Sequence, residues 1–240
     1  KLEKQMVHEL YNSLLTDEEV SLIKESQGSG VVLDKSEQFG MRLLAVPCVR
    51  QRLHTWELMN EFDDRVTDIG PPLLVVEKAC REVRESASLK QYLSVVLTVG
   101  NILNAGNQAR GRADGFNLET LATLYEMRDS ANKVTVFDLC AKYCRGNLAL
   151  ELEHVSDAAG VDTKYLQGQL NKLVRDFTAV AGEVRKAAET LPPSDEFVRA
   201  ATAFVAEKQA ELDALKATLT ATDQLFRDTV QWMTLGEGTY

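Results

Sequence analysis

The segment with the clearest potential for chemistry is a glycine-rich polar loop, NAGNQARGRADG, at residues 104–115. Backbone amides in such loops can cradle phosphate groups, and Gly106 and Gly111 have the four intervening residues of a P-loop. However, Arg112 and Ala113 stand where a P-loop carries Lys and Ser or Thr, and the loop follows a helical pattern rather than a strand. The loop therefore does not predict a phosphate site.

The cysteines are the next candidates, as metal ligands. Cys140 and Cys144 are one helical turn apart and could share a metal, but neither a histidine nor a third cysteine lies nearby in sequence. Cys48 and Cys80 are isolated, and no CxxC spacing occurs. We predict reduced, buried thiols, with no metal and no cofactor. Because no nucleophile or zinc-protease signature occurs either, the residues indicate interaction rather than catalysis, and the protein is predicted not to be an enzyme.

Composition restricts the partners. The 240 residues are 45% apolar and 26% charged, enough for a substantial core, and the net charge is −9. This charge argues against a nucleic-acid or anionic-membrane surface, because both require a surplus of Lys and Arg. No run approaches the roughly 20 apolar residues of a membrane span, and the first residues lack the apolar core of a signal peptide. A cytoplasmic location is expected.

Helical signals dominate the first 60 residues. Thr16 and Glu19 form the capping-box pattern that starts a helix, which the glycines at 28–30 should end. Asp34 can cap the next helix, and Pro47 should break it. With only five prolines and 14 glycines in the chain, we predict a nearly all-helical fold.

Two central segments carry more specific expectations. Pro71 and Pro72 predict the start of a helix, because proline is tolerated in a first helical turn. The run LKQYLSVVLTVGNIL at residues 89–103 is apolar on more than one face, which predicts a helix buried between neighbours.

The last third of the chain predicts two long helices. Apolar residues at alternating steps of four and three extend for about 38 Å, and LPPSDE at 191–196 then interrupts them, with Ser194 available as a helix cap. A second seam follows, interrupted by Lys208, so an antiparallel hairpin is expected. The first seam is Leu166, Leu170, Leu173, Phe177, Val180, Val184, Ala187 and Leu191, and the second is Phe197, Ala201, Phe204, Leu212, Leu215, Leu219, Phe226, Val230 and Met233.

The segment LTVGNILNAGNQARGRADGFNLETLATL at 97–124 resembles the signature of formin homology two domains, G-N-x-x-N-x-G followed after a variable loop by G-F-x-L. SEQFGMRLLAVPCVRQRL at 36–53 is similar to another part of that family. So are FDDRVTDIGPPLLVVEKACREVRES at 62–86 and RDSANKVTVFDL at 128–139. The segments keep the family's order along the chain.

The resemblance implies an elongated all-α bundle with a knob, a coiled coil and a post. Residues 1–62 correspond to a knob-like region, 63–156 to central helices and a post-like region, and 157–240 to the long antiparallel heptad pair. It also implies a binding partner, actin, in the cytoskeleton. In such proteins the complete domain is a head-to-tail homodimer that nucleates filaments and elongates them processively at the barbed end.

By the same resemblance, the chain begins inside the knob and ends before the last helix, so the N-terminal lasso and linker are missing. The lasso of one subunit encircles the post of the other. We therefore expect this chain by itself to be mostly monomeric, neither nucleating nor capping filaments.

The resemblance also assigns candidate site residues. The post surface that receives the partner's lasso corresponds to Gly100, Asn101, Asn104, Gly106, Gly115 and Phe116. Gly100 would allow close backbone approach, and Asn101 and Asn104 share a helix face. The alternative is that the asparagines only cap the helix and Gly106 only ends it.

Basic residues could contact the acidic surface of actin. Arg128 and Lys133 fall in the corresponding loop, and Arg110 and Arg112 could extend the patch, although two exposed cations are also compatible with simple solvation. Trp56 and Trp232 are expected to be packing residues. The competing reading is a helical scaffold that binds partners without actin-assembly activity. That reading leaves the GNILNAG and GFNL block unexplained.

Overall fold

The structure is a computed structural model that describes residues 3–28, 32–107 and 111–234. Within these ranges it has eleven α-helices and no strand, apart from an isolated bridge between Arg128 and Thr135. The predicted all-α fold is confirmed. The helices are α1 (Lys4–Asn12), α2 (Asp17–Gly28), α3 (Lys35–Leu44), α4 (Val49–Glu85), α5 (Ala87–Leu103), α6 (Thr120–Glu126), α7 (Val136–Lys142), α8 (Leu148–Glu151), α9 (Val155–Ala158), α10 (Thr163–Thr190) and α11 (Glu196–Thr234).

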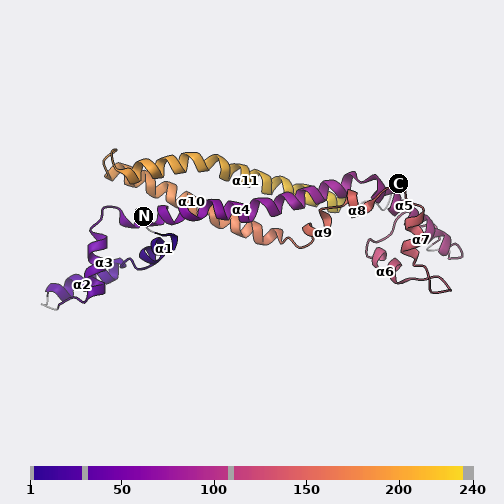
Figure 1. Cartoon of the computed structure of the whole chain (residues 1–240), viewed down its shortest axis with the longest axis horizontal. Coiled ribbons are helices and arrows are strands. Elements are labelled where there is room, and N and C mark those ends of the chain that lie inside the picture. Colours follow the sequence, from indigo (N-terminus) through magenta and orange to yellow (C-terminus); the bar gives the residue numbers. More distant parts are fainter. Residues whose placement is uncertain (1–2, 29–31, 108–110, 235–240) are drawn as a thin grey trace. The chain divides into compact units, whose positions relative to one another are not determined.

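The chain divides into two compact units, each assembled from segments far apart in sequence. Unit 1 comprises Lys1–Gly70 and Lys164–Ala217, and unit 2 comprises Pro71–Thr163 and Thr218–Tyr240. Helices α1–α3 and nearly all of α10 thus belong to unit 1, and α5–α9 belong to unit 2, as the colours of Figure 1 help to follow. The two longest helices, α4 and α11, contribute to both.

Three phenylalanines from three helices meet in the core of unit 1. The ring of Phe62 on α4 lies 5.7 Å from the rings of both Phe177 on α10 and Phe204 on α11, and the last two are 6.1 Å apart. Phe62 meets Phe204 edge to face, an arrangement that the ring quadrupoles favour. Phe62 and Phe177 are almost completely inaccessible to solvent. This phenylalanine cluster joins the three long helices of the unit.

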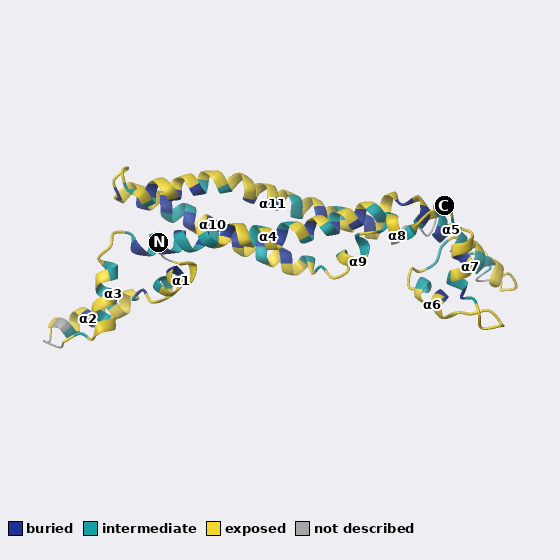
Figure 2. Cartoon of the chain, in the orientation of Figure 1, coloured by how far each residue is buried: buried dark blue, intermediate teal, exposed yellow. Residues whose placement is uncertain are grey.

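Ion pairs between α4 and α10 show that the two helices run in opposite directions. His54 contacts Glu183 at 2.9 Å, and eleven residues further along α4 Arg65 contacts Asp176 at 2.9 Å, earlier in α10. The predicted seam of α10 faces this core, as the recurring dark blue patches in Figure 2 show. Its buried residues are Leu166, Leu170, Leu173, Phe177, Val180, Val184 and Ala187.

Contacts between α4 and α11 show that these two helices are parallel. Arg52 contacts Asp195, just before α11, at 2.6 Å, and later Asp63 contacts Lys208 at 2.7 Å. α10 and α11 therefore form the expected antiparallel hairpin. Lys208 interrupts the apolar seam without leaving a buried charge unpaired, because its ammonium lies 5.5 Å from the centroid of the Phe62 ring and reaches Asp63.

The second half of α11 corrects the predicted seam. Phe226 and Val230 are exposed, by 46% and 39%, whereas Thr222 and Thr229 are buried. A strict seven-residue repeat keeps one face of a helix toward the same neighbours, and the threonines continue this register. The hydroxyl of Thr229 donates to Leu225 O, but that of Thr222 has no partner. The inward-facing positions are Ala201, Lys208, Leu215, Thr222 and Thr229.

Helix α4 corrects a second prediction, because Pro71 and Pro72 lie inside it rather than at a helix start. Each proline lacks the N–H that would bond to the carbonyl four residues earlier, which normally weakens a helix interior. Here Ile69 and Leu73, on either side, are 1% and 0% exposed, so tertiary packing maintains the helix through the prolines. The boundary between the two units falls at Gly70 and Pro71.

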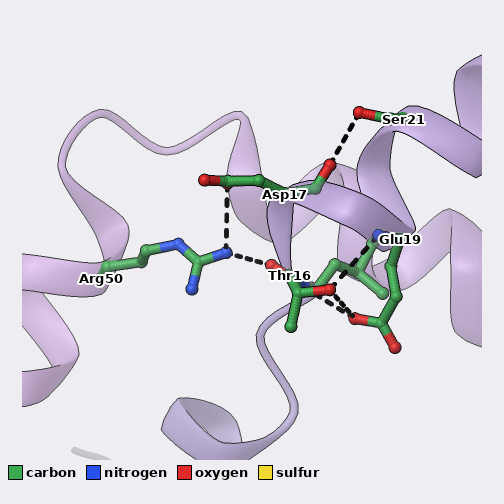
Figure 3. A network of polar contacts seen from close by, with 6 residues as sticks. Thr16, Asp17, Glu19, Ser21 and Arg50 are labelled. Carbon is green, nitrogen blue, oxygen red and sulfur yellow. Dashed lines mark hydrogen bonds and ion pairs between the residues drawn. The ribbon is translucent and has the colours of Figure 1, made fainter.

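Arg50 attaches the start of α2 to α4. Its guanidinium donates to the carbonyl of Leu15 and lies 3.8 Å from the carboxylate of Asp17 (Figure 3). The predicted capping box is present, because Thr16 N donates to Glu19 at 2.7 Å and Glu19 N donates to the Thr16 hydroxyl at 3.2 Å. The predicted cap Asp34 is also present at the start of α3, where it forms a capping box with Glu37.

In unit 2, helix α5 is less buried than its composition predicts. Its buried residues are Ser88, Tyr92 and Val96, whereas Ile102 and Leu103 at its end are 67% and 61% exposed. The prediction of burial on more than one face was wrong, because α6, α7 and α8 contact α5 over a limited length and leave its last turn uncovered.

Glu151 of α8 joins the end of α4 to the start of α5. Its carboxylate accepts from the Ser86 hydroxyl at 2.6 Å, from Ser88 N at 3.1 Å, and from the Ser88 hydroxyl. These hydrogen bonds hold the pKa of Glu151 below its usual value. Ser86 is the single residue between the two helices, and its hydroxyl also accepts from Leu89 N at 2.9 Å. The junction is therefore fixed by side chains.

Candidate protein-interaction surface

The glycine and asparagine motif lies at the end of α5 and in the loop that follows. Asn101 is bonded twice to the loop, with its amide nitrogen donating to Ala113 O at 2.9 Å and its amide oxygen accepting from Ala113 N at 2.8 Å. The amide of Asn104 instead donates to Gly100 O at 2.9 Å, so it terminates its own helix. The two asparagines thus differ in role, and Asn101 sets the position of the loop.

The glycines of the motif differ as well. A Cβ on Gly100 or Gly106 would meet no atom within 4 Å, so both present bare backbone to open space. Gly106 does not adopt the left-handed conformation that is typical of a glycine ending a helix, which removes the helix-stop interpretation. The sterically demanding position is Gly111, where a Cβ would lie 2.5 Å from Asn104 O. Gly111 stood out in the sequence only through its P-loop-like spacing from Gly106, and not as a position that a side chain could not occupy.

Phe116 anchors the far end of the same loop. It packs, half-buried, against a core cluster of Tyr92, Val96, Leu124 and Cys140, and Gly115 beside it is also half-buried. Burial raises the pKa of the Tyr92 hydroxyl, which has no hydrogen-bond partner. Phe116 therefore fixes the end of the loop by packing against the core, and it is not itself a largely exposed residue of the surface.

The loop after α6 presents the two predicted basic residues. Asp129 organises it, because its carboxylate accepts from Lys133 N at 2.7 Å and from Val134 N at 3.2 Å. Asn132 takes the left-handed conformation at φ 56°, which asparagine tolerates better than most residues. Arg128 and Lys133 are both exposed at the two ends of this turn. The structure brings them onto one loop, as the sequence predicted.

The charge of this loop is partly balanced by its own acids. Hydrogen bonds from the amides of Lys133 and Val134, and then the nearby Arg128, hold the pKa of Asp129 below its usual value. The pKa of Asp138 is lowered by hydrogen bonds from Thr135, with a smaller contribution from Arg128. Arg112 is exposed, and Arg110 lies outside the described residues.

Exposed apolar side chains surround these motifs, and sequence reasoning missed them. The sequence predicted burial of the run that contains Ile102 and Leu103, whereas each of the side chains named below is at least 38% exposed. Where exposed apolar side chains form a contiguous patch they mark a protein-interaction surface, so these residues are candidates for such a surface. From the end of α5 to the end of α7 they are Ile102, Leu103, Leu118, Tyr125, Met127, Leu139 and Tyr143.

The other candidate residues have packing roles. Cys80 and Cys140 are buried and Cys48 and Cys144 half-buried, all four as free thiols, and burial raises the pKa of Cys80, Cys140 and Cys144. Across the described ranges there is no group of three or more residues able to hold a metal ion, and no helix there is both long and apolar enough to cross a membrane. Trp56 packs in the core cluster beneath α1, and Trp232 lies beneath the Lys90 ammonium at 5.8 Å, so both are packing residues as predicted.

Comparison with known proteins decides the family. The family model of the Formin Homology 2 Domain matches residues 1–239, which is nearly the whole chain and includes both units. The chain belongs to the formin homology 2 family. This formin homology 2 chain therefore carries the family's signature at 97–124 on the end of α5, the following loop and α6.

Relatives of this formin homology 2 chain come from amoebae and plants. Formin-C of Dictyostelium discoideum is 28% identical over 97% of the chain, which covers 21% of that protein. Formin-like protein 20 of Arabidopsis thaliana is 28% identical over 88% of the chain and 13% of its own length. Formin-like protein 18 of Arabidopsis thaliana is 34% identical over 68% of the chain and 15% of its own length. The chain thus spans about a fifth or less of these relatives.

Proposed function

We propose that this chain is an actin-binding module of a formin, which takes part in nucleation and processive barbed-end elongation of actin filaments within a longer homodimeric domain. The observation that carries the proposal is the family match over residues 1–239. The exposed apolar and basic residues of unit 2 support a role in binding protein partners. The role is assembly rather than catalysis, it uses no cofactor, and it places the protein in the cytoplasm at the cytoskeleton.

Within this proposal, Arg128 and Lys133 contact the acidic surface of actin. Both side chains are exposed, and the loop between them is ordered by Asp129. A loop fixed in advance loses less conformational entropy when it binds, which favours its use as a contact. The chain carries a net charge of −9, so a local basic loop is the feature that could offset repulsion from an acidic partner.

The motif at the end of α5 forms, in the same proposal, the surface that receives a second formin subunit. Gly100 and Gly106 expose backbone to which another chain can approach closely, while Asn101, Asn104, Gly115 and Phe116 keep the loop in position. Exposed Ile102 and Leu103 supply apolar area next to the glycines. The partner is therefore a second copy of the full domain.

Actin polymerisation kinetics test the proposal. The chain with its native upstream sequence should accelerate assembly of fluorescent actin, and Arg128→Glu with Lys133→Glu should weaken binding to filament ends. Reversal of Lys172 and Arg175, two exposed cations on α10, makes the same charge change in unit 1 and serves as the control. Unchanged actin kinetics with the longer, folded protein would instead favour a helical scaffold without assembly activity.

Analytical ultracentrifugation separates the two proposed surfaces. Charge reversal at Arg128 and Lys133 should leave the mass of the longer protein unchanged, because these residues are assigned to actin. Gly100→Trp should reduce dimerisation, since a large side chain would fill the open space above this glycine. A dimer of unaltered stability in the Gly100 variant would remove the motif from the subunit interface.

A further inference from the structure

Two histidines lie where α1 packs on α4, one on each helix. His8 of α1 pairs through Nδ1 with the carboxylate of Glu57 on α4, and its Nε2 lies 2.9 Å from the Asn12 amide. His54 of α4 pairs through Nδ1 with Glu183 of α10 at 2.9 Å. Because an imidazole can donate to a carboxylate in either protonation state, these contacts persist as neutral hydrogen bonds or strengthen as ion pairs.

The two pairs are physically connected. Tyr11, one turn after His8 on α1, stacks on the ring of His54 with centroids 5.3 Å apart and an angle of 14° between the planes. Beneath the stack lies a small apolar core, in which Val7 is completely buried. Helix α1 has only nine residues, so side-chain contacts rather than helix length must hold it in place.

Acidic groups outnumber bases around both imidazoles. Glu57 and Glu61 on α4 and Glu9 on α1 face His8. Around His54 the groups that raise its affinity for a proton are Glu183, Glu57 and Asp176, although Asp176 also pairs with Arg65. Arg50 is a basic residue near this contact, and its positive charge opposes the rise in the pKa of Tyr11. With both histidines neutral, Glu57 and Glu183 have no cationic partner among the ion pairs of the described residues, whereas Asp176 keeps Arg65.

The direction of titration follows from these contacts. The hydrogen bond and charge of Glu57 raise the pKa of His8 above its ordinary 6.5. The hydrogen bond that His54 donates to Glu183 raises the pKa of His54 despite the opposing effect of burial. A group whose pKa is higher when folded stabilises the folded state fully below its unfolded pKa, and this contribution is lost as the pH rises through the folded value.

We propose that His8 and His54 form a pH-sensitive latch that fastens α1 onto α4 when both are protonated and loosens it as the rising pH removes their protons. Each protonation converts a contact between helices into an ion pair. The His8 pair joins α1 to α4 directly, whereas the His54 pair joins α4 to α10 and reaches α1 through the Tyr11 ring stacked on His54. The latch opens α1 locally and leaves the phenylalanine cluster of unit 1 in place.

Amide hydrogen exchange of the whole chain tests the latch. Protection of residues 4–12, corrected for the intrinsic pH dependence of exchange, should be several-fold higher at about pH 6 than at about pH 8. The difference should disappear in the His8→Gln, His54→Gln double variant. It should remain in the control His154→Gln, since His154 forms the corresponding pair with Glu82 at 2.5 Å in unit 2.

A second variant keeps the test decisive if the double variant loses order in α1 at both pH values. Glu57→Gln retains both histidines and the aromatic stack but removes the charge that His8 pairs with. It should reduce the pH dependence of α1 protection and lower the pKa of His8 measured by proton NMR. Equal protection of wild-type α1 at both pH values, or an undiminished pH dependence in Glu57→Gln, would overturn the latch.

Discussion

Asn101 holds Ala113 through two hydrogen bonds, of 2.9 and 2.8 Å, across the loop that follows α5. Asn101→Ala would leave a half-buried donor and acceptor of the loop backbone without partners. We expect the loss of about 1–3 kcal/mol of stability in unit 2, measured by denaturant unfolding. Asn104→Ala, which removes one exposed bond within α5, should cost at most about 1 kcal/mol. Equal costs for the two variants would contradict the assigned roles.

Gly40 predicts a steric effect at the contact between α3 and the loop before α2. A Cβ on this buried residue would lie 2.7 Å from Leu15 Cδ1 and 2.8 Å from Cγ. Gly40→Ala should therefore destabilise unit 1 by about 1–3 kcal/mol. The control is Gly182→Ala in α10, where a Cβ meets nothing within 4 Å. Because alanine favours helix, it should stabilise by about 0.5–1 kcal/mol, and circular dichroism melting compares the two.

The phenylalanine cluster should dominate the stability of unit 1. Phe177→Ala removes the ring that contacts both Phe62 and Phe204 and should cost about 3–5 kcal/mol in urea unfolding. Phe226→Ala makes the same chemical change at a position that is 46% exposed. Its cost should stay below about 1 kcal/mol. Similar losses in both variants would argue against the observed register of α11.

Thr222 offers a stabilising change that tests the same register. Its hydroxyl is buried without a hydrogen-bond partner, which costs free energy that a methyl group would not. Thr222→Val should raise stability by about 1 kcal/mol, seen as a higher urea midpoint. Thr229→Val is the matched control and should gain less, because it removes a hydrogen bond to Leu225 O. A loss of stability in Thr222→Val would mean that this hydroxyl is satisfied.

The Asp129 carboxylate makes the order of the loop from Arg128 to Lys133 dependent on pH. Its pKa is lowered in the folded chain, so its contribution is present above the ordinary 3.8 and is lost as the pH falls through the folded value. The amides of Lys133 and Val134 should then lose hydrogen-exchange protection in acid. Asp129→Ala should remove that protection at neutral pH and, if the actin proposal holds, weaken filament-end binding with Arg128 and Lys133 intact. Protection that persists in Asp129→Ala would contradict this role of the carboxylate.

Local signals in the sequence were sufficient for much of the fold. The seam of α10 was predicted residue by residue, since a repeat of four and three has one buried face wherever the helix packs. The capping box at Thr16 and the helix cap at Asp34 were also predicted, because the partners lie within three residues of each other in both.

The sequence predictions failed where contacts with residues far away in the chain determine the local structure. Pro71 and Pro72 predicted the start of a helix, but α4 continues through them, with Ile69 and Leu73 buried on either side. Ser194 was expected to cap α11, yet Phe197 N donates to Asp195, which also binds Arg52 of α4. At the candidate surface, the sequence marked the asparagines but could not show that Asn101 reaches across to Ala113.

The discontinuity of the two units has a consequence for synthesis of the protein. Unit 1 combines the first 70 residues with Lys164–Ala217, and unit 2 is completed by Thr218 onward. On the ribosome, the phenylalanine cluster of unit 1 cannot be complete until Phe204 of α11 has emerged, whereas the cluster of unit 2 around Tyr92 is built from residues that precede α10. The apolar face of α4 around Phe62 therefore stays partly uncovered until late in synthesis, a stage at which exposed apolar surface favours aggregation.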